Sequence, residues 1–114
     1  MPYLMLHNAA AFAAFVINSF QGKQTFSRMR DDGKTIMHAE IQINGSTVMF
    51  CEATDQWKQQ PASLFLYVGN ADETYHAALQ NGATGVMELS DQDYGRTCGV
   101  KDPCGNTWWV TSVR

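Results

Sequence analysis

The sequence predicts an α+β fold built from two consecutive βαβββ modules. Apolar residues form a strand-length run, then recur at helical spacing, then form three more strand-length runs, and the same order begins again in the second half. Glycines recur with this order, because Gly82 follows Gly22 by 60 residues, as Gly105 follows Gly45. Neither half has enough apolar surface to bury a core alone, so we expect the two modules to share one.

The chain length is that of one domain, since 114 residues bury a substantial core but are few for two independent ones. A polar stretch with a proline, TDQWKQQP, separates the two halves and is typical of a linker. We expect a single domain over 1–114, with module one at 1–53, the linker at 54–61 and module two at 62–114.

Each module is expected to begin with a short strand and a capped helix. Asn8 is the expected N-cap of the first helix and Gly22 its end, and Asn70 and Gly82 have the same places in the second. The first strand of each module is expected at 3–6 and at 63–68. The remaining strands are expected at 23–30, 35–43, 47–53, 85–89, 96–100 and 107–113.

Two strands show which faces their side chains occupy. Residues on a strand point alternately to opposite faces, so Trp108 and Trp109 cannot have the same surroundings. The same alternation divides the strand over 35–43 into two faces. Its apolar face contains Met37, Ala39, Ile41 and Ile43, and its polar face contains His38, Glu40 and Gln42.

Composition and charge exclude several classes of protein. The chain is 45% hydrophobic and 17% charged, which is ordinary for a soluble globular protein. A net charge of −3 without a Lys/Arg cluster argues against a nucleic-acid or anionic-membrane surface, and no apolar run is long enough to span a membrane. Three cysteines without CxxC spacing suit a reducing compartment. We therefore expect a cytoplasmic protein.

Several motifs resemble those of a known superfamily. They are the Pro2-Tyr3-Leu4 start, the MHAEIQINGSTVMF hairpin and the YGRTCGVKDPCGNTWWV ending. In these motifs and in its repeated βαβββ pattern, the chain resembles the vicinal oxygen chelate superfamily of glyoxalase I, bleomycin-resistance proteins and extradiol dioxygenases, and within it the PhnB-like branch. The most specific segment is D-P-x-G-N-x-W-W, where Asp102 can accept hydrogen bonds from the turn. Arg96 directly follows the YG pair, where relatives often have an intervening polar residue, so the resemblance assigns it no role.

The resemblance implies curved mixed sheets around a cavity, with a helix on the convex side of each sheet, and a homodimer. In catalytic members a divalent metal lies in the cavity, held by His, Glu or Gln side chains that leave open positions for substrate. Carried over to this chain, the ligand positions fall on Trp109, on Met49, near Ser63, and near Met1 or Pro2. None of these is a suitable ligand for such an ion. We therefore expect no metal and no other cofactor.

The resemblance also implies which residues line the cavity. Trp109 would look into it, while Trp108 would face the core packed by the helices; the alternative is that both tryptophans are core residues. Cys51 lies two residues after Met49 and points to the same face of its strand, and Phe65 and Tyr67 share a face with Ser63. The expected ligand-binding residues are Trp109, Met49, Cys51, Ser63, Phe65 and Tyr67. Such a lining suits a flat or apolar small molecule.

Three residues are weaker candidates for catalysis. His38 and Glu40 could act as a base with its orienting carboxylate, but a structural polar pair or a dimer contact is the favoured explanation. The 60-residue offset places Cys98 opposite His38, so a Cys/His pair is conceivable, but free cysteines are more often inert packing residues.

Three functions remain open from the sequence. The first is metal-free binding of a small, aromatic molecule in the lined cavity. The second is a metal-dependent lyase of the glyoxalase kind or a dioxygenase, with a divalent metal held by residues such as His38 and Glu40. The third is a structural homodimer module. Substitution of all the expected ligand positions favours the first.

Overall fold

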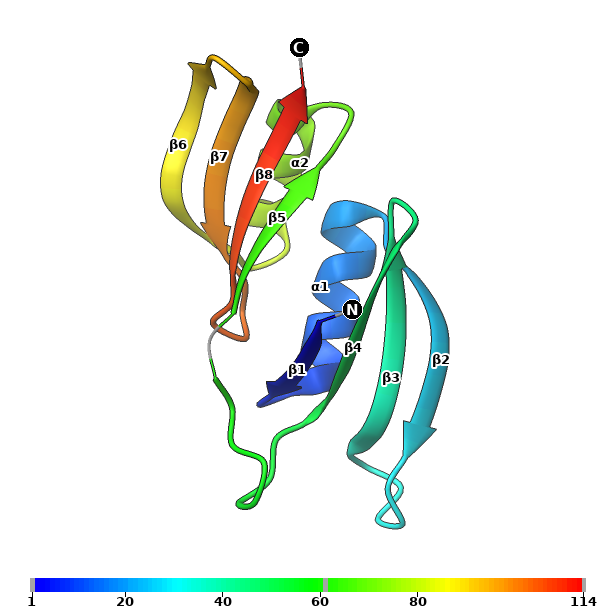
Figure 1. Cartoon of the computed structure of the whole chain (residues 1–114). Helices are drawn as coiled ribbons and strands as arrows, with labels where there is room; N and C mark the ends of the chain where they lie inside the picture. The colour runs from blue at the N-terminus through cyan, green and yellow to red at the C-terminus, as the bar shows by residue number, and fades with distance from the viewer. Residues whose placement is uncertain (1, 61, 114) are drawn as a thin grey trace.

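The computed structural model describes residues 2–60 and 62–113 and contains two four-stranded mixed sheets with two helices. The first sheet has the order β1-β4-β3-β2 and the second the order β5-β8-β7-β6 (Figure 1). In each sheet the first strand pairs in parallel with the last, and the other pairs are antiparallel. The predicted α+β class with two βαβββ units is therefore confirmed.

The first unit contains β1 (Tyr3–Leu6), α1 (Ala9–Phe20), β2 (Lys23–Met29), β3 (Ile36–Ile43) and β4 (Ser46–Glu52). Asn8 caps α1 as predicted, because its side chain accepts a hydrogen bond from the amide of Ala11. The last residue of α1 is Phe20, and Gln21, with a left-handed backbone (φ 57°), forms the C-cap one residue before the predicted Gly22. Gly22 allows close packing instead, since a Cβ there would lie 2.6 Å from Cγ1 of Val16.

The second unit contains β5 (Ser63–Tyr67), α2 (Ala71–Gln80), β6 (Thr84–Gln92), β7 (Gly95–Lys101) and β8 (Thr107–Val113). Asn70 caps α2 through a hydrogen bond from the amide of Glu73, as predicted. Gly82 follows the helix with a φ of 100°, in the region that favours glycine. The expected strand at 85–89 extends further on both sides in β6.

One core joins the two units. Phe12 on α1 packs against Phe50 of the first sheet, with ring centroids 5.0 Å apart, and against Trp108 of the second sheet, at 6.2 Å. Trp108 also contacts Phe20, at 4.8 Å, and is 2% exposed. The helices pack against each other and lie behind the sheets in Figure 1. In the part of the chain that the structure describes, the other face of each sheet therefore has no helix over it.

Met37 does not follow the predicted alternation of its strand. Ala39, Ile41 and Ile43 are buried as expected, but Met37 is exposed and Ile36 is buried in its place. The physical reason is a register shift between β2 and β3, where Arg28 pairs with His38 and the next residue, Met29, pairs with Ile36. Such an irregularity reverses the faces of the residues beyond it.

Candidate functional site

The uncovered face of the second sheet contains most of the predicted ligand-binding residues. Phe65 on β5 pairs with Trp109 on β8, and Ser63 precedes it on the same face. The rings of Phe65 and Tyr67 lie 5.1 Å apart, and both side chains are more than half exposed. Trp109 is half-buried, in contrast to Trp108, so the prediction that the two tryptophans face different surroundings is confirmed.

The indole of Trp109 lies directly over a glycine of the neighbouring strand. Gly99 on β7 pairs with Trp109, and a Cβ added to it would lie 2.6 Å from Cζ3 of the indole and 2.9 Å from Cε3. The absence of a side chain at Gly99 therefore allows the ring to lie against the sheet. Trp109 is thus half-buried on this face, beside Phe65.

Trp108 is held by a buried turn instead. The carboxylate of Asp102 accepts hydrogen bonds from Nε1 of Trp108 (2.8 Å), from the amides of Cys104 and Asn106 (both 2.9 Å) and from the side chain of Asn106. The expectation that Asp102 accepts hydrogen bonds from the DPCGN turn is thus confirmed. This turn fixes the start of β8 and, with it, the side of the sheet to which each tryptophan points.

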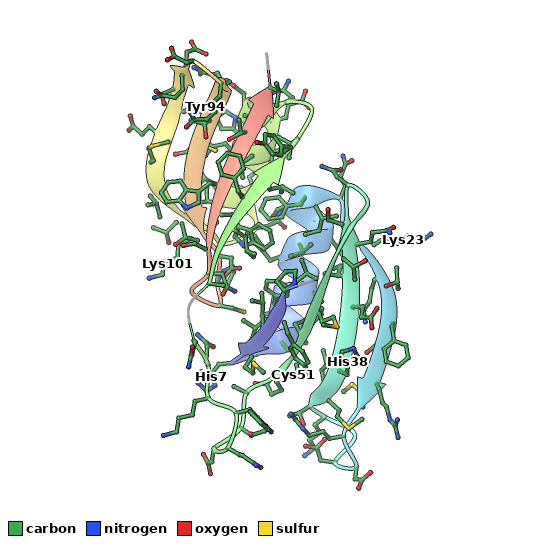
Figure 2. All side chains as sticks on the ribbon, in the orientation of Figure 1. His7, Lys23, His38, Cys51, Tyr94 and Lys101 are labelled. Atoms are coloured by element: carbon green, nitrogen blue, oxygen red, sulfur yellow. The ribbon has the colours of Figure 1, made fainter. Side chains whose placement is uncertain are left out.

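Met49 and Cys51 lie on the first sheet, apart from the other four predicted residues. Met49 on β4 pairs with Tyr3 on one side and Glu40 on the other, and Cys51 pairs with Met5. Figure 2 shows Cys51 on β4 and His38 on the neighbouring β3. Within one chain, therefore, the six residues form two groups on two sheets and not a single wall.

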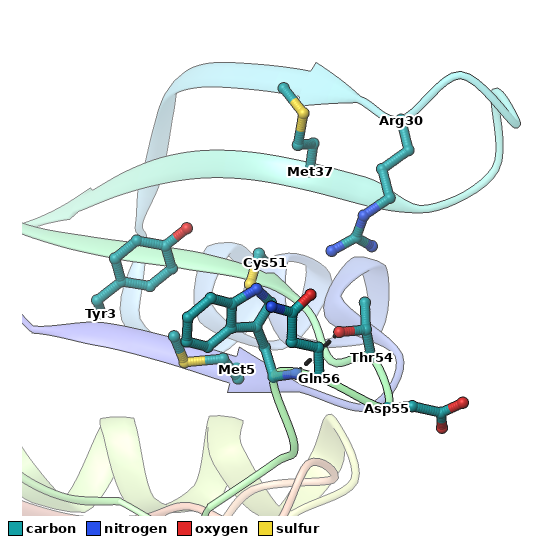
Figure 3. Close-up of a pocket in the computed structure, with 9 residues that line it drawn as sticks. Tyr3, Met5, Arg30, Met37, Cys51, Thr54, Asp55 and Gln56 are labelled. Carbon is teal, nitrogen blue, oxygen red and sulfur yellow. Dashed lines mark hydrogen bonds between the residues drawn. The ribbon is translucent and has the colours of Figure 1, made fainter.

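A pocket lies at one end of the first sheet, where the linker folds over β1 and β4 (Figure 3). Its volume is about 770 Å³, in the range typical of small-molecule sites. Cys51 is the only predicted residue among those that line it. The others are Tyr3, Met5, Arg30, Met37, Thr54, Asp55, Gln56 and Trp57. Sequence reasoning missed this pocket, although a tryptophan inside a polar linker was a usable signal.

His38 and Glu40 are brought together, as their spacing predicted. Nε2 of His38 lies 3.1 Å from a carboxylate oxygen of Glu40, and Nδ1 lies 3.5 Å from the hydroxyl of Tyr3. The ring also contacts Phe26, with centroids 5.8 Å apart. The imidazole thus lies between the Glu40 carboxylate and the Tyr3 phenol.

Cys98 does not join His38, and the expected correspondence between them is wrong. On the first sheet Ile41 pairs with Val48, seven positions later, whereas on the second Val100 pairs with Trp108, eight positions later. The extra residue in the second connection turns Cys98 to the core face, where it is completely buried. Burial raises the pKa of its thiol to about 11, so at neutral pH it is a protonated packing residue.

Arg96, whose role the sequence left open, forms an ion pair with the first turn of α2. Its Nε lies 2.9 Å from Oδ1 of Asp72, and its Nη1 lies 3.5 Å from a carboxylate oxygen of Asp91. This hydrogen bond from Arg96 lowers the pKa of the Asp72 carboxyl. Arg96 therefore connects α2 to the second sheet and does not line the pocket.

The metal implied by the resemblance does not fit the side chains at the corresponding positions. Trp109, Met49 and Ser63 supply an indole, a thioether and a hydroxyl, and Pro2 supplies no side-chain donor; Met1 lies outside the described residues. Among residues 2–60 and 62–113, no group of three or more His, Cys, Asp or Glu residues could hold a metal ion. This donor set favours neither the hard nor the borderline ions of such sites.

These features define a class of small α+β protein in which two sheets with helices on one face leave aromatic surfaces on the other. The match to a family model over residues 4–110 goes further: the chain belongs to the Glyoxalase/Bleomycin resistance protein/Dioxygenase superfamily. Among the described residues, no helix is long and apolar enough to cross a membrane.

Relatives and solved structures agree with this assignment. Uncharacterised proteins of Mycobacterium bovis and Mycobacterium tuberculosis are 33% identical over 94% of this chain and over 78% and 69% of their own lengths. Three solved structures share the fold. TioX from Micromonospora sp. ML1 has a TM-score of 0.79 and 20% identity, and the match covers 100% of this chain and 94% of that one. A PhnB protein from Bacillus cereus has a TM-score of 0.73 and 18% identity, with 99% and 98% covered, and TnmS3, an antibiotic-binding protein from Streptomyces sp. CB03234, has a TM-score of 0.75 and 11% identity, with 98% and 92% covered.

Proposed function

We propose that this protein binds a small aromatic molecule without a metal and does not chemically change it. The observation that carries the proposal is the pocket of about 770 Å³ between the first sheet and the linker, which is lined mainly by aromatic and sulfur-containing side chains. Such side chains bury a flat ligand by apolar contact and ring stacking. The described antibiotic binding of TnmS3 gives a precedent on the same fold.

The proposal includes a homodimer in which the uncovered sheet faces are covered by a second copy. Tyr3 and Phe26 on the first sheet and Phe65 and Tyr67 on the second are between 44% and 59% exposed in the single chain. Large exposed aromatic groups of this kind mark interaction sites. A second copy would also bring Trp109 of one chain near a pocket of the other, which would reunite the two groups of predicted residues.

Calorimetric titration of a panel of flat aromatic compounds into EDTA-treated protein tests the proposal. We expect saturable binding and unchanged compounds in the mixture afterwards, as measured by mass spectrometry. Elemental analysis after reloading with Ni²⁺, Zn²⁺, Mn²⁺ or Fe²⁺ should then give only trace metal. Stoichiometric metal, or consumption of a compound that depends on it, would instead favour a lyase or dioxygenase.

The contacts of His38 support a second candidate, an acid–base activity without metal. An imidazole between the Glu40 carboxylate and the Tyr3 hydroxyl can accept a proton on one nitrogen while the other is oriented. If a panel compound were consumed, His38→Gln should abolish the reaction and leave binding intact. Weaker binding with an unchanged kcat would show that His38 contributes to recognition only.

A further inference from the structure

Arg30 follows the end of β2 and enters the pocket between the first sheet and the linker, where Figure 3 shows its guanidinium directed toward Cys51 and Gln56. One nitrogen, Nη2, donates a 2.8 Å hydrogen bond to the backbone carbonyl of Glu52. This bond holds the half-buried side chain in place. Because a guanidinium has five N–H donors in a fixed plane, several remain for a ligand.

No carboxylate of residues 2–60 and 62–113 forms an ion pair with Arg30. Asp32 lies in the turn that follows Arg30, where its carboxylate accepts hydrogen bonds from the amides of Lys34 and Thr35 and from the Thr35 hydroxyl. These hydrogen bonds lower the pKa of the Asp32 carboxyl, which lies outside the pocket, and the charge of Arg30 adds to this. Asp55 belongs to the pocket rim, but its carboxylate is exposed and points away from the other labelled side chains in Figure 3. The positive charge of Arg30 is therefore not matched from within the pocket.

The charge of Arg30 acts across the pocket. Burial raises the pKa of the Tyr3 phenol, and the neighbouring Cys51 adds to this, whereas Arg30 acts in the opposite direction. An anion placed between the two side chains would thus meet a guanidinium on one side and a hydroxyl donor on the other.

Trp57 supplies a large aromatic side chain to the same pocket. Its amide donates to the Thr54 hydroxyl at 2.9 Å, and the amide of Thr54 donates to the carbonyl of Trp57 at 2.8 Å. This pair of bonds fixes the turn that carries the indole. Although Trp57 is 56% exposed, it lines the pocket together with Met5 and Tyr3.

We propose that the pocket between β1, β4 and the linker selects a planar aromatic acid, with Arg30 as the partner of its carboxylate and Trp57 as the wall for its ring. This inference rests on the proposed binding function and specifies its ligand class. Arginine recognises carboxylates through two parallel hydrogen bonds, and an aromatic wall adds contact area without requiring a particular ring substituent.

The test compares 1-naphthoate with its neutral analogue 1-naphthamide by calorimetry on the intact protein. We expect the carboxylate to bind at least about tenfold more tightly, the effect of one charge-assisted hydrogen bond. Arg30→Gln should remove this preference while leaving the amide affinity nearly unchanged. Arg30→Lys should keep part of it, which separates lost charge from lost folding. Trp57→Ala should lower the affinity for both compounds.

A matched control comes from a charge outside the pocket. Arg28→Gln removes one positive charge from β2, two residues before Arg30, and should keep the preference for the carboxylate. Equal affinities for the two compounds, or a preference that survives Arg30→Gln, would overturn the inference and leave the general binding proposal standing. Binding that Trp57→Ala does not alter would also overturn it. Binding of neither compound would contradict both.

Discussion

Neighbouring tryptophans with opposite surroundings show how much a single strand position decides. Trp108 is buried against α1 and hydrogen-bonded to Asp102, whereas Trp109 lies on the uncovered face over Gly99. The alternation of a strand predicts that the two differ. Which of them faces the core required the resemblance, because both side chains are large, apolar and suited to burial.

Replacing these two residues should have opposite consequences. Trp108→Ala should lower the free energy of unfolding by about 3–5 kcal/mol, because it leaves a large cavity beside Phe12 and Phe20. Trp109→Ala should cost much less stability but reduce affinity for an aromatic ligand, because the proposed dimer brings Trp109 near the pocket of the other copy. Urea unfolding and ligand titration of both variants measure this, and equal losses of stability would contradict the assignment of faces.

Gly99 provides a second test of the position of Trp109. Gly99→Ala should displace the indole, since the new Cβ would lie 2.6 Å from Cζ3, and should change both the near-ultraviolet circular dichroism and the ligand affinity. The control is Gly69→Ala, where a Cβ has no atom within 4 Å. Identical behaviour of the two variants would show that the ring does not depend on Gly99.

The buried thiols should be unreactive in the folded chain. Burial raises the pKa of the Cys98 and Cys104 thiols to about 11, whereas a cysteine thiol in an unfolded chain has a pKa of about 8.5. The folded state therefore keeps these protons longer, and stability should fall as the pH rises from about 8.5 to about 11. At mildly alkaline pH, iodoacetamide should label both cysteines only after denaturation, as measured by mass spectrometry. Rapid labelling of the folded protein would contradict this.

At the scale of elements, the length of each connection determines which side chains of a strand face the core. The hairpin between β3 and β4 and the longer turn between β7 and β8 differ by one residue in pairing distance. Strand existence and helix caps followed from local patterns, because those depend on neighbours in sequence. The face of Cys98 and the position of Met37 did not, because they depend on a turn length and on a register shift between strands.

The turn around Asp102 should be the most sensitive connection. Asp102→Ala leaves Nε1 of Trp108, the side chain of Asn106 and two amides without their acceptor, so we expect a loss of at least about 1–3 kcal/mol. In a Trp108→Phe background, which removes Nε1, the same substitution should cost less. Thermal or urea unfolding of the wild type, the two single variants and the double variant gives the free energies of this double-mutant cycle. Strictly additive losses would argue against the hydrogen bond between Trp108 and Asp102.

At the scale of the whole molecule, the two sheets share one core through α1 and leave their other faces uncovered. The sequence supported this architecture through its repeated order of elements. It could not reveal the pocket, because Arg30, Tyr3 and Trp57 come from three separate segments that the sheet and the linker bring together only in the folded chain.

The proposed homodimer is tested at the same scale. Phe65→Glu should shift the protein toward a monomer in sedimentation velocity, because it places a charge on the uncovered face of the second sheet. Leu79→Glu changes an exposed apolar residue of α2, on the helix side of that sheet, and should leave the mass unchanged. A monomeric wild-type protein, or an equal effect of both substitutions, would contradict the dimer proposed here.

The linker that joins the two sheets has a further consequence through Gln59. Its side chain accepts a hydrogen bond from the amide of His7 in the first unit and donates one of 2.9 Å to the carbonyl of Cys104 in the second. The segment that follows Trp57 is thus anchored to both units at Gln59. Exchange of residues 54–58 between relatives would be expected to transfer ligand preference while leaving the folding of either sheet intact, so that selectivity and stability could diverge independently.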